Sequence, residues 1–178
     1  MNTWVTGDTH FGHELLVKLS GRPENFSALE LKRLRKKVGL DDLLIHLGDF
    51  CIGDEHFWHK EWASIPGRNK ILVLGNHDKR SLTWYLNKGW SAVVNTLSLT
   101  IFGESIIFSH RPINPAVTEA TINIHGHHHG NTHHDRPDWY AKGFHLEYAP
   151  ELFSYAPLLL NQKTLYKTLR GCGREQNV

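Results

Sequence analysis

The sequence predicts a layered α/β fold with two packed β-sheets, and two observations support that prediction. In the first half of the chain, short apolar runs alternate with helical patterns in the order βαβαβα, which is typical of parallel strands joined by crossover helices. In the second half, strand-like runs follow one another until a final helical segment, which indicates antiparallel strands. The 178 residues suit one domain, which we place over residues 1–170, with residues 171–178 as a frayed tail.

Six short runs have the composition of buried strands, because they are rich in Ile, Val, Leu and aromatic residues. They cover residues 4–6, 43–47, 71–74, 97–101, 106–108 and 122–124. Helical patterns cover residues 27–38, 55–64 and 81–87, each between two of these runs, and residues 158–169 near the end. Leu31, Leu34 and Val38 share one face of the first helix, and Ser27 with Glu30 predicts a capping box at its start.

Composition excludes several classes of protein. No apolar run is long enough to span a bilayer, and the net charge of +2 is too small to indicate nucleic-acid binding by itself. A strand-like stretch follows Met1 almost at once, so we expect no signal peptide. Cys51 and Cys172 are too few for a disulfide framework. We therefore expect a cytoplasmic protein without a membrane partner, whose oligomeric state the sequence does not indicate.

Potential metal ligands gather where the strand-like runs end. The chain has 14 histidines, the side chain that most often binds transition metals. The candidates at these ends are Asp8 and His10, then Asp49, then Asn76, His77 and Asp78, then His110, and last His127 and His129. Strand ends line the ligand crevice of an α/β sheet, so we expect these side chains to converge. Carboxylate, amide and imidazole ligands suit Mn, Fe or Zn.

Local spacing suggests how the ligands pair. In an extended backbone, residues i and i+2 point to the same side, which places Asp8 with His10 on one ion and likewise His127 with His129. Glycines at positions 7, 48, 75 and 126 are interpreted as sharp turns of the backbone as it leaves each strand.

These residues carry a resemblance to a known family. The series Asp8-x-His10, Gly48-Asp49, Gly75-Asn76-His77-Asp78, His110 and Gly126-His127-x-His129 resembles the motifs of the calcineurin-like metallophosphoesterases. All five blocks occur in the family's order, which is far more specific than any one block. The short chain and its Asp8-Thr9-His10-Phe11-Gly12-His13 opening are similar to the small bacterial and phage members. The resemblance implies an α/β/β/α sandwich, in which two packed mixed β-sheets are flanked by helices.

The resemblance also implies a role for each candidate residue. One ion would be held by Asp8, His10 and His129, the other by Asn76, His110 and His127, and Asp49 would bridge both. His77 would be catalytic and would lie over the substrate phosphate without binding metal. Many family members carry an Asp at the position of Ile52 to orient this His, so Asp54 and Asp78 are considered as replacements.

Two further residues are candidates for binding the substrate phosphate. His13 either contacts the phosphate or caps the helix-like stretch that starts at Glu14. Arg111 follows a candidate ligand and is either a phosphate-binding side chain or an ordinary exposed arginine.

The predicted activity is hydrolysis of a phosphate ester by a hydroxide that two divalent ions activate. Two such ions bring about four positive charges, and Asp8, Asp49 and the hydroxide remove about three, so the site attracts an anionic phosphate. Mn is the first choice, with Fe, Zn or Ni as alternatives. A small chain leaves little room for a cap over the site, which slightly favours a phosphodiester, a nucleotide or nucleic acid over a small monoester.

Two alternatives remain beside this hydrolase. The same fold could serve as a non-catalytic metal-binding scaffold, although such proteins usually lose ligands that are present here. A metallo-β-lactamase site is disfavoured because Asn131 stands where its motif requires Asp. Other prominent residues receive structural interpretations. His125 and His128 are expected to pack or to support the metal ligands, Cys51 to be a small buried hydrophobe, and His133 and His134 to lie on a loop. Residues 32–37 are expected to form a solvated helix face. Packing rather than base stacking is expected for the aromatic residues Phe11, Trp58, Trp62, Trp84 and Trp139.

Overall fold

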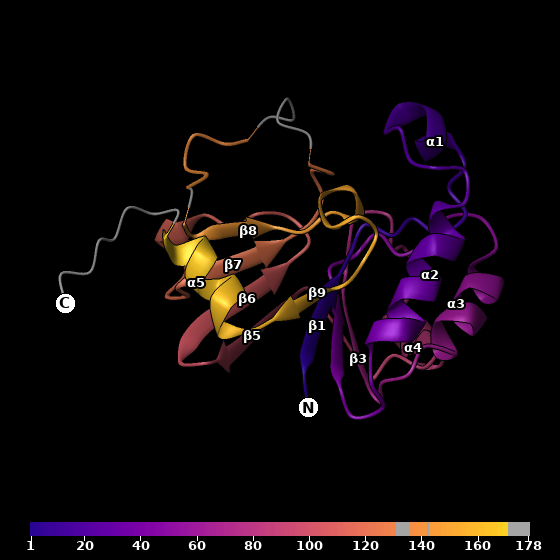
Figure 1. Cartoon of the computed structure of the whole chain (residues 1–178), viewed down its shortest axis with the longest axis horizontal. Coiled ribbons are helices and arrows are strands. Elements are labelled where there is room, and N and C mark those ends of the chain that lie inside the picture. The colour runs from indigo at the N-terminus through magenta and orange to yellow at the C-terminus, as the bar shows by residue number, and fades with distance from the viewer. Residues whose placement is uncertain (131–135, 142, 171–178) are drawn as a thin grey trace.

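Two β-sheets pack face to face in the computed structural model, which describes residues 1–130, 136–141 and 143–170 (Figure 1). The first sheet has the order β4-β3-β2-β1-β9. Its strands are β1 (Thr3–Thr6), β2 (Leu43–His46), β3 (Asn69–Val73), β4 (Ala92–Val94) and β9 (Leu158–Leu160). Strands β1 to β4 pair in parallel and β9 is antiparallel to β1, so the sheet is mixed.

The second sheet has the order β5-β6-β7-β8 and is also mixed. Its strands are β5 (Thr96–Ile101), β6 (Glu104–Ser109), β7 (Ile122–His125) and β8 (His145–Glu147). Only β5 and β6 pair antiparallel, whereas β6, β7 and β8 are parallel. The expectation of antiparallel strands in the second half therefore holds for this hairpin and for β9 beside β1, and it is wrong for the pairing of β6, β7 and β8. The chain returns from β6 to β7 through a segment containing only the short 3-10 turn η1 (Pro115–Val117), so no helical pattern signals the crossover.

Helices flank the sheets, which confirms the predicted sandwich. Helices α2 (Phe26–Lys37), α3 (Glu55–Ala63) and α4 (Leu82–Leu86) lie together on the side of the first sheet away from the second (Figure 1). Helix α1 (Leu15–Leu19) projects beside them, while the 3-10 turn η2 (Pro150–Phe153) and helix α5 (Gln162–Arg170) precede and follow β9. Helices α2, α3 and α4 connect the parallel strands β1 to β4, as the alternating pattern predicts.

Two local predictions are wrong. Residues 158–160 begin the expected last helix but form β9, because this apolar run pairs with β1 and the helix starts only at Gln162. The capping box is also absent: Asn25 is the N-cap of α2, and the Ser27 hydroxyl accepts a hydrogen bond from the N–H of Gly12 at 3.2 Å. Glu30 is buried and lies 3.9 Å from Arg22. Contacts with distant segments thus take both side chains away from the helix start.

The apolar core has two parts. One lies between the helices and the first sheet and includes Leu34, Leu44 and Trp62. The other contains residues of both sheets, such as Ile45 and Ile124. The strands of the first sheet are therefore covered on both faces, which explains their nearly continuous apolar sequences.

Candidate metal centre

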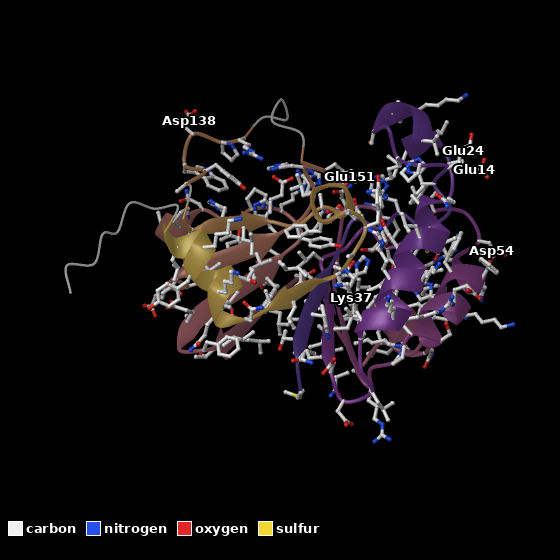
Figure 2. All side chains as sticks on the ribbon, viewed as in Figure 1. Glu14, Glu24, Lys37, Asp54, Asp138 and Glu151 are labelled. Carbon is white, nitrogen blue, oxygen red and sulfur yellow. The ribbon has the colours of Figure 1, made fainter. Side chains whose placement is uncertain are left out.

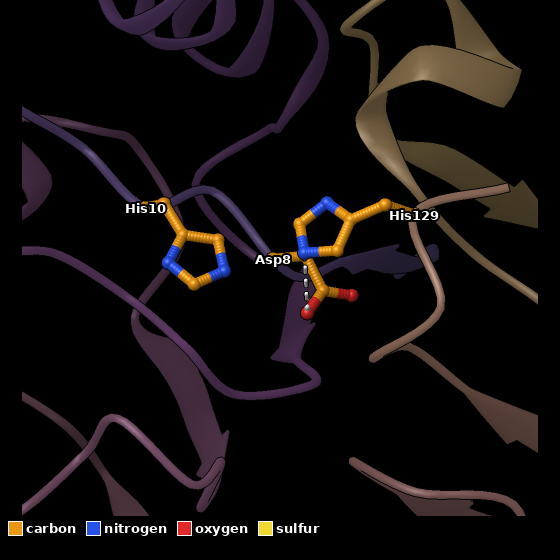
Figure 3. Close-up of side chains that lie close together, drawn as sticks. All are labelled: Asp8, His10 and His129. Atoms are coloured by element: carbon orange, nitrogen blue, oxygen red, sulfur yellow. Dashed lines mark ion pairs between the residues drawn. The ribbon is translucent and has the colours of Figure 1, made fainter. Parts of the chain in front are cut away.

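Two groups of side chains follow the ends of the parallel strands, and in each group the potential ligand atoms lie within 4.8 Å of one another. The first group is Asp8, His10 and His129, and the second group is Asp49, His110 and His127. In Figure 3 the His129 imidazole lies directly above the Asp8 carboxylate, to which a dashed line joins it, and the His10 imidazole lies to the left of both. The two groups fit a pair of metal ions.

The backbone at these residues is left-handed rather than extended. The φ angle is 49° at Asp8, 43° at His10, 55° at Asp49, 76° at His127 and 53° at His129. Such values cost about 1–3 kcal/mol at a residue other than glycine and are concentrated at functional sites. The extended-backbone argument is therefore wrong where it pairs His127 with His129, because these two belong to different groups. Asp8 and His10 do share one group, but not for the reason given by an extended strand.

Glycines next to the ligands mainly permit close approach. Among positions 7, 48, 75 and 126, only Gly48 has a positive φ, at 93°. A Cβ atom at Gly75 would collide with the Asp49 carboxylate, and one at Gly126 with the carboxylate of Asp8. The interpretation as sharp turns therefore holds for Gly48, whereas Gly75 and Gly126 make room for ligands.

The Asp49 carboxylate belongs to the second group and also faces the first. Its Oδ2 atom is 3.5 Å from Nε2 of His10 in the first group and 3.4 Å from Nε2 of His110 in the second. Its Oδ1 atom accepts a hydrogen bond from the His77 N–H at 2.8 Å. A single oxygen of Asp49 therefore faces ligands of both groups.

Asn76 and His77 lie at the same place in the fold. The Oδ1 atom of Asn76 is 2.9 Å from Nε2 of His110, which adds this amide oxygen to the second group. The His77 side chain is 47% exposed, and its Nε2 atom is 3.9 Å from Asp49 Oδ2. Its ring packs edge-on against His10 at a centroid distance of 5.3 Å. His77 thus stands at the solvent side of the carboxylate between the groups.

His13 and Arg111 lie at opposite sides of this arrangement. The His13 ring centroid is 5.7 Å from that of His10 in the first group. The Arg111 guanidinium is exposed and donates to Asn76 Oδ1 at 3.5 Å, beside the second group. An open cleft of about 400 Å³ adjoins the second group, and its lining includes Asn76, His110 and Arg111 together with Asn95 and Thr96.

Neither replacement considered for the residue that orients His77 is placed for that role. Asp54 caps helix α3 by accepting from the N–H of Phe57 at 2.9 Å. The Asp78 carboxylate accepts from the N–H groups of Asp49 and Gly75, each at 2.8 Å. Asp78 therefore ties together the two loops that carry Asp49 and Asn76.

Buried polar atoms in the groups have the chemistry of metal ligands. Asp8 Oδ1 is buried and has no hydrogen-bond partner among the described residues, and the same holds for Nδ1 of His10. Burial raises the pKa of Asp8 to about 6, and it lowers the pKa of His10 to about 2 and that of His127 to about 3. The imidazoles of His10 and His127 are therefore neutral near pH 7, the form in which His binds a metal ion.

Arg22 and Glu151 are site residues that the sequence analysis missed. Arg22 is buried and forms hydrogen bonds with the Asp8 carbonyl and with Glu151. Glu151 lies in η2 and is 3.5 Å from Nδ1 of His129. No local pattern marks either residue, because 129 positions separate them in the sequence.

The remaining prominent residues take structural places. His125 is buried, with Nε2 2.9 Å from the Tyr140 hydroxyl, and the His128 ring packs against His125. Cys51 is partly buried against the core, where burial raises the pKa of its thiol. The aromatic residues Phe11 and Trp62 belong to the core cluster beside the helices, Trp58 and Trp84 pack against it, and Trp139 packs against His145. His133, His134, Cys172 and the expected tail lie outside the described residues.

The fold and the site together define the class. A sandwich of two mixed sheets with paired carboxylate and imidazole groups at its strand ends is the architecture of a metallophosphoesterase. The chain belongs to the calcineurin-like phosphoesterase family, whose model matches residues 1–168.

Two relatives are similar to this chain in sequence. The gene 66 protein of Mycobacterium phage L5 is 40% identical over 83 residues, a stretch that spans 43% of this chain and 40% of the phage protein. The uncharacterized protein MJ1445 of Methanocaldococcus jannaschii is 23% identical over 168 residues, which cover 89% of this chain and 86% of that protein.

Two solved structures are similar to this chain. The protein of unknown function AQ665 from Aquifex aeolicus has a TM-score of 0.75 at 27% identity, covering 93% of this chain and 98% of AQ665. An archaeal phosphodiesterase has a TM-score of 0.55 at 17% identity, covering 92% of this chain and 95% of its own, a likeness of fold alone. In the described parts of the chain, no helix has the length and apolar character needed to cross a membrane.

Proposed function

We propose that this chain is a two-metal phosphoesterase that hydrolyses a phosphodiester or a nucleotide. The observation that carries the proposal is the position of Asp49 Oδ2, within 3.5 Å of imidazoles from both groups. In this proposal Asp49 is the shared ligand of two ions. The first ion has Asp8, His10 and His129 as its other ligands, and the second has Asn76, His110 and His127.

The donor set suits divalent first-row metals. Carboxylate oxygens, an amide oxygen and neutral imidazoles favour Mn, with Fe, Zn or Ni as alternatives. When bound, a pair of such ions supplies a hydroxide nucleophile near neutral pH and stabilises negative charge on the phosphate.

The residues around the ligands would hold and protonate the substrate. His77 is half-exposed beside Asp49, where its imidazole can donate a hydrogen bond or a proton to the phosphate or to the leaving oxygen. His13 on one side and Arg111 on the other would bind the phosphate oxygens. His13 lies beside the first group, His77 beside Asp49 and Arg111 beside Asn76, so each would contact a phosphate held at this site.

The open cleft favours a substrate with a second ester substituent. Its lining includes Asn76 and His110 of the second group as well as Asn95 and Thr96, so a group attached to the phosphate could occupy it. A nucleoside could use the amide and hydroxyl groups of these two residues, whereas a small monoester would leave the cleft empty. A nucleotide or a nucleic-acid end is therefore the proposed partner class.

A rate comparison tests this function. The Mn-loaded protein is assayed on an aryl phosphate monoester and on the corresponding diester, before and after His77→Ala. We expect faster cleavage of the diester, and a loss of at least about tenfold in rate for His77→Ala with Mn content unchanged, because a general acid contributes about 10²–10⁴-fold. His56→Ala, which removes an exposed histidine of α3, is the matched control and should keep the rate.

Each part of the proposal has its own contrary outcome. Absence of Mn-dependent cleavage by the unmodified protein would favour the non-catalytic scaffold. A rate unchanged by His77→Ala would remove His77 from the mechanism, and faster cleavage of the monoester would contradict the role of the cleft.

A further inference from the structure

Arg22 is buried at the back of the first group. Its side chain is 0% exposed. Its Nη1 atom donates to the Thr9 carbonyl at 2.9 Å, and its Nη2 atom donates to the carbonyl of Asp8 at 2.8 Å. A buried guanidinium is costly unless it is paired with an anion, and its Nε atom donates to Oε1 of Glu151 at 2.7 Å. Arg22 therefore joins the loop that carries Asp8 to a residue near the other end of the chain.

Glu151 reaches this position from η2. In Figure 2 the labelled acidic residues Glu14, Glu24, Asp54 and Asp138 lie at the periphery, whereas Glu151 lies in the interior of the view, where η2 meets the N-terminal half. The same Oε1 atom that accepts from Arg22 is 3.5 Å from Nδ1 of His129. One carboxylate oxygen thus contacts both the buried arginine and a ligand candidate.

Protonation of His129 determines what this contact does. The Nε2 atom of His129 points to the first group and is 3.9 Å from Oδ1 of Asp8. To bind an ion, Nε2 needs its lone pair, so the single proton of the neutral ring must sit on Nδ1. Two groups face Nδ1 of His129: Nη2 of Arg22 at 3.2 Å and Oε1 of Glu151 at 3.5 Å. Arg22 has only donors and cannot receive that proton, whereas Glu151 Oε1 can accept it, so the metal-binding tautomer depends on Glu151. A metal-binding His commonly donates its other N–H to a carboxylate or carbonyl, which fixes the ring and its tautomer.

We propose that Glu151, held in place by Arg22, is the positioning residue that fixes His129 with Nε2 toward the first ion. The inference rests on the metal-binding part of the proposed function. Arg22 acts twice, because it anchors the Glu151 carboxylate and also holds the carbonyls of the left-handed Asp8 loop. Its planar fork makes these bonds in several directions at once, so Lys is not an equivalent replacement.

The second group offers an internal comparison. There Nδ1 of His110 lies 2.8 Å from the carbonyl of Leu47, a backbone acceptor that a side-chain substitution does not remove. Loss of Glu151 should therefore lower the affinity for the first ion and leave the affinity for the second unchanged.

Mn titration of Glu151→Ala tests the proposal. Electron paramagnetic resonance distinguishes a spin-coupled Mn pair from a single Mn ion, and calorimetry gives the affinity of each. We expect the coupled signal to need about 10- to 100-fold more Mn, the usual effect of removing an outer partner, while one ion still binds with unchanged affinity. Glu151→Gln keeps an acceptor of the same shape and should restore part of the affinity, which a loss of folding would not allow.

Two further variants identify the weakened ion and control for the loss of an ion pair. His110→Ala removes a ligand of the second group, so its combination with Glu151→Ala should leave no tightly bound ion. Glu61→Ala breaks the pair formed by Arg35 and Glu61, 2.8 Å apart on the surface of α2 and α3, and should bind two ions normally.

The outcomes separate this inference from the proposed function. Two ions bound by Glu151→Ala as tightly as by the unmodified protein would overturn the positioning role and leave the hydrolase intact. An unmodified protein that binds two ions without cleaving any ester would overturn the hydrolase, while selective loss of one ion in Glu151→Ala would still support the positioning role. An equal loss of affinity for both ions in Glu151→Ala would also contradict the positioning role.

Discussion

The first and second groups of the metal centre are positioned in different ways. In the second group, His110 and His127 follow the parallel neighbours β6 and β7, and the His110 ring is oriented by a backbone carbonyl. In the first group, His129 lies further along its loop and is contacted by a pair from two distant segments, the buried Arg22 and the partly buried Glu151. Where strand pairing alone brings ligands together, the backbone suffices to orient them. In our proposal, charged side chains orient His129 in the first group, so metal binding there depends on residues that are not themselves ligands.

Removing the carboxylate common to both groups should have the largest effect. In Asp49→Asn the side chain keeps its shape but loses the charge that faces His10 and His110. We expect loss of paired metal binding and a fall in rate of more than about 100-fold, beyond the range typical of an outer partner. Metal analysis after dialysis, together with the diester assay, measures both. Two tightly held ions in this variant would refute Asp49 as the shared ligand.

A substitution at Gly126 should disturb the first group more than the second, although Gly126 precedes His127, whose N–H donates to Asp8 Oδ2 at 2.8 Å. The new Cβ atom of Gly126→Ala would meet the Asp8 carboxylate, and such overpacking typically costs about 1–3 kcal/mol. We expect the affinity for one Mn ion to fall by about tenfold or more while the other is retained, as calorimetric titration can show. Gly39→Ala is the control, since its Cβ atom would lie 3.1 Å from the Asp42 carboxylate, away from both groups. Equal weakening of both ions would mean that the two groups are not independent.

His46 should give the smallest effect and should not discriminate between the groups. His46 connects the loops that follow β1 and β2, because its Nε2 atom is 3.0 Å from the Thr9 hydroxyl and its Nδ1 atom accepts from the N–H of Gly48. Burial lowers the pKa of His46 to about 3. The folded protein therefore binds fewer protons here than the unfolded chain between pH values of about 3 and 6.5, so stability falls as the pH drops through this range.

The size of the His46 contribution to stability follows from the same coupling between protonation and folding. Between about pH 7 and about pH 5.5, His46 should remove about 1 kcal/mol from the free energy of unfolding of the metal-free protein. Urea denaturation at both pH values gives the free energy of unfolding of the unmodified protein and of His46→Gln. Between these pH values the stability of the variant should fall by about that much less than the stability of the unmodified protein. An equal loss in both proteins would assign the pH dependence to other groups.

Much of this structure is accessible from the sequence because it depends on local patterns. Strands β1 to β3 and β5 to β7 and helices α2 to α4 follow from apolar runs and helical periodicity, whereas β4 and β8 lie outside the predicted runs. The residues of both groups follow from their positions after strands. The pairing of strands depends on contacts between distant segments and was predicted less well. The parallel crossover from β6 to β7 contains no helix, and residues 158–160 are a strand only because β1 lies beside them.

The site shows the same division. Spacing placed His127 with His129, but left-handed backbone at both residues sends them to different groups. The family resemblance divided them as the structure does. Arg22 and Glu151 escaped both approaches, because an isolated Arg and an isolated Glu have no signature until the fold brings them to 2.7 Å.

Anomalous scattering from crystals grown with Mn tests most directly whether the two groups hold a pair of ions. We predict two neighbouring peaks on either side of Asp49, one coordinated by Asp8, His10 and His129 and the other by Asn76, His110 and His127. A single peak, or Mn bound only away from these side chains, would contradict the two-metal site.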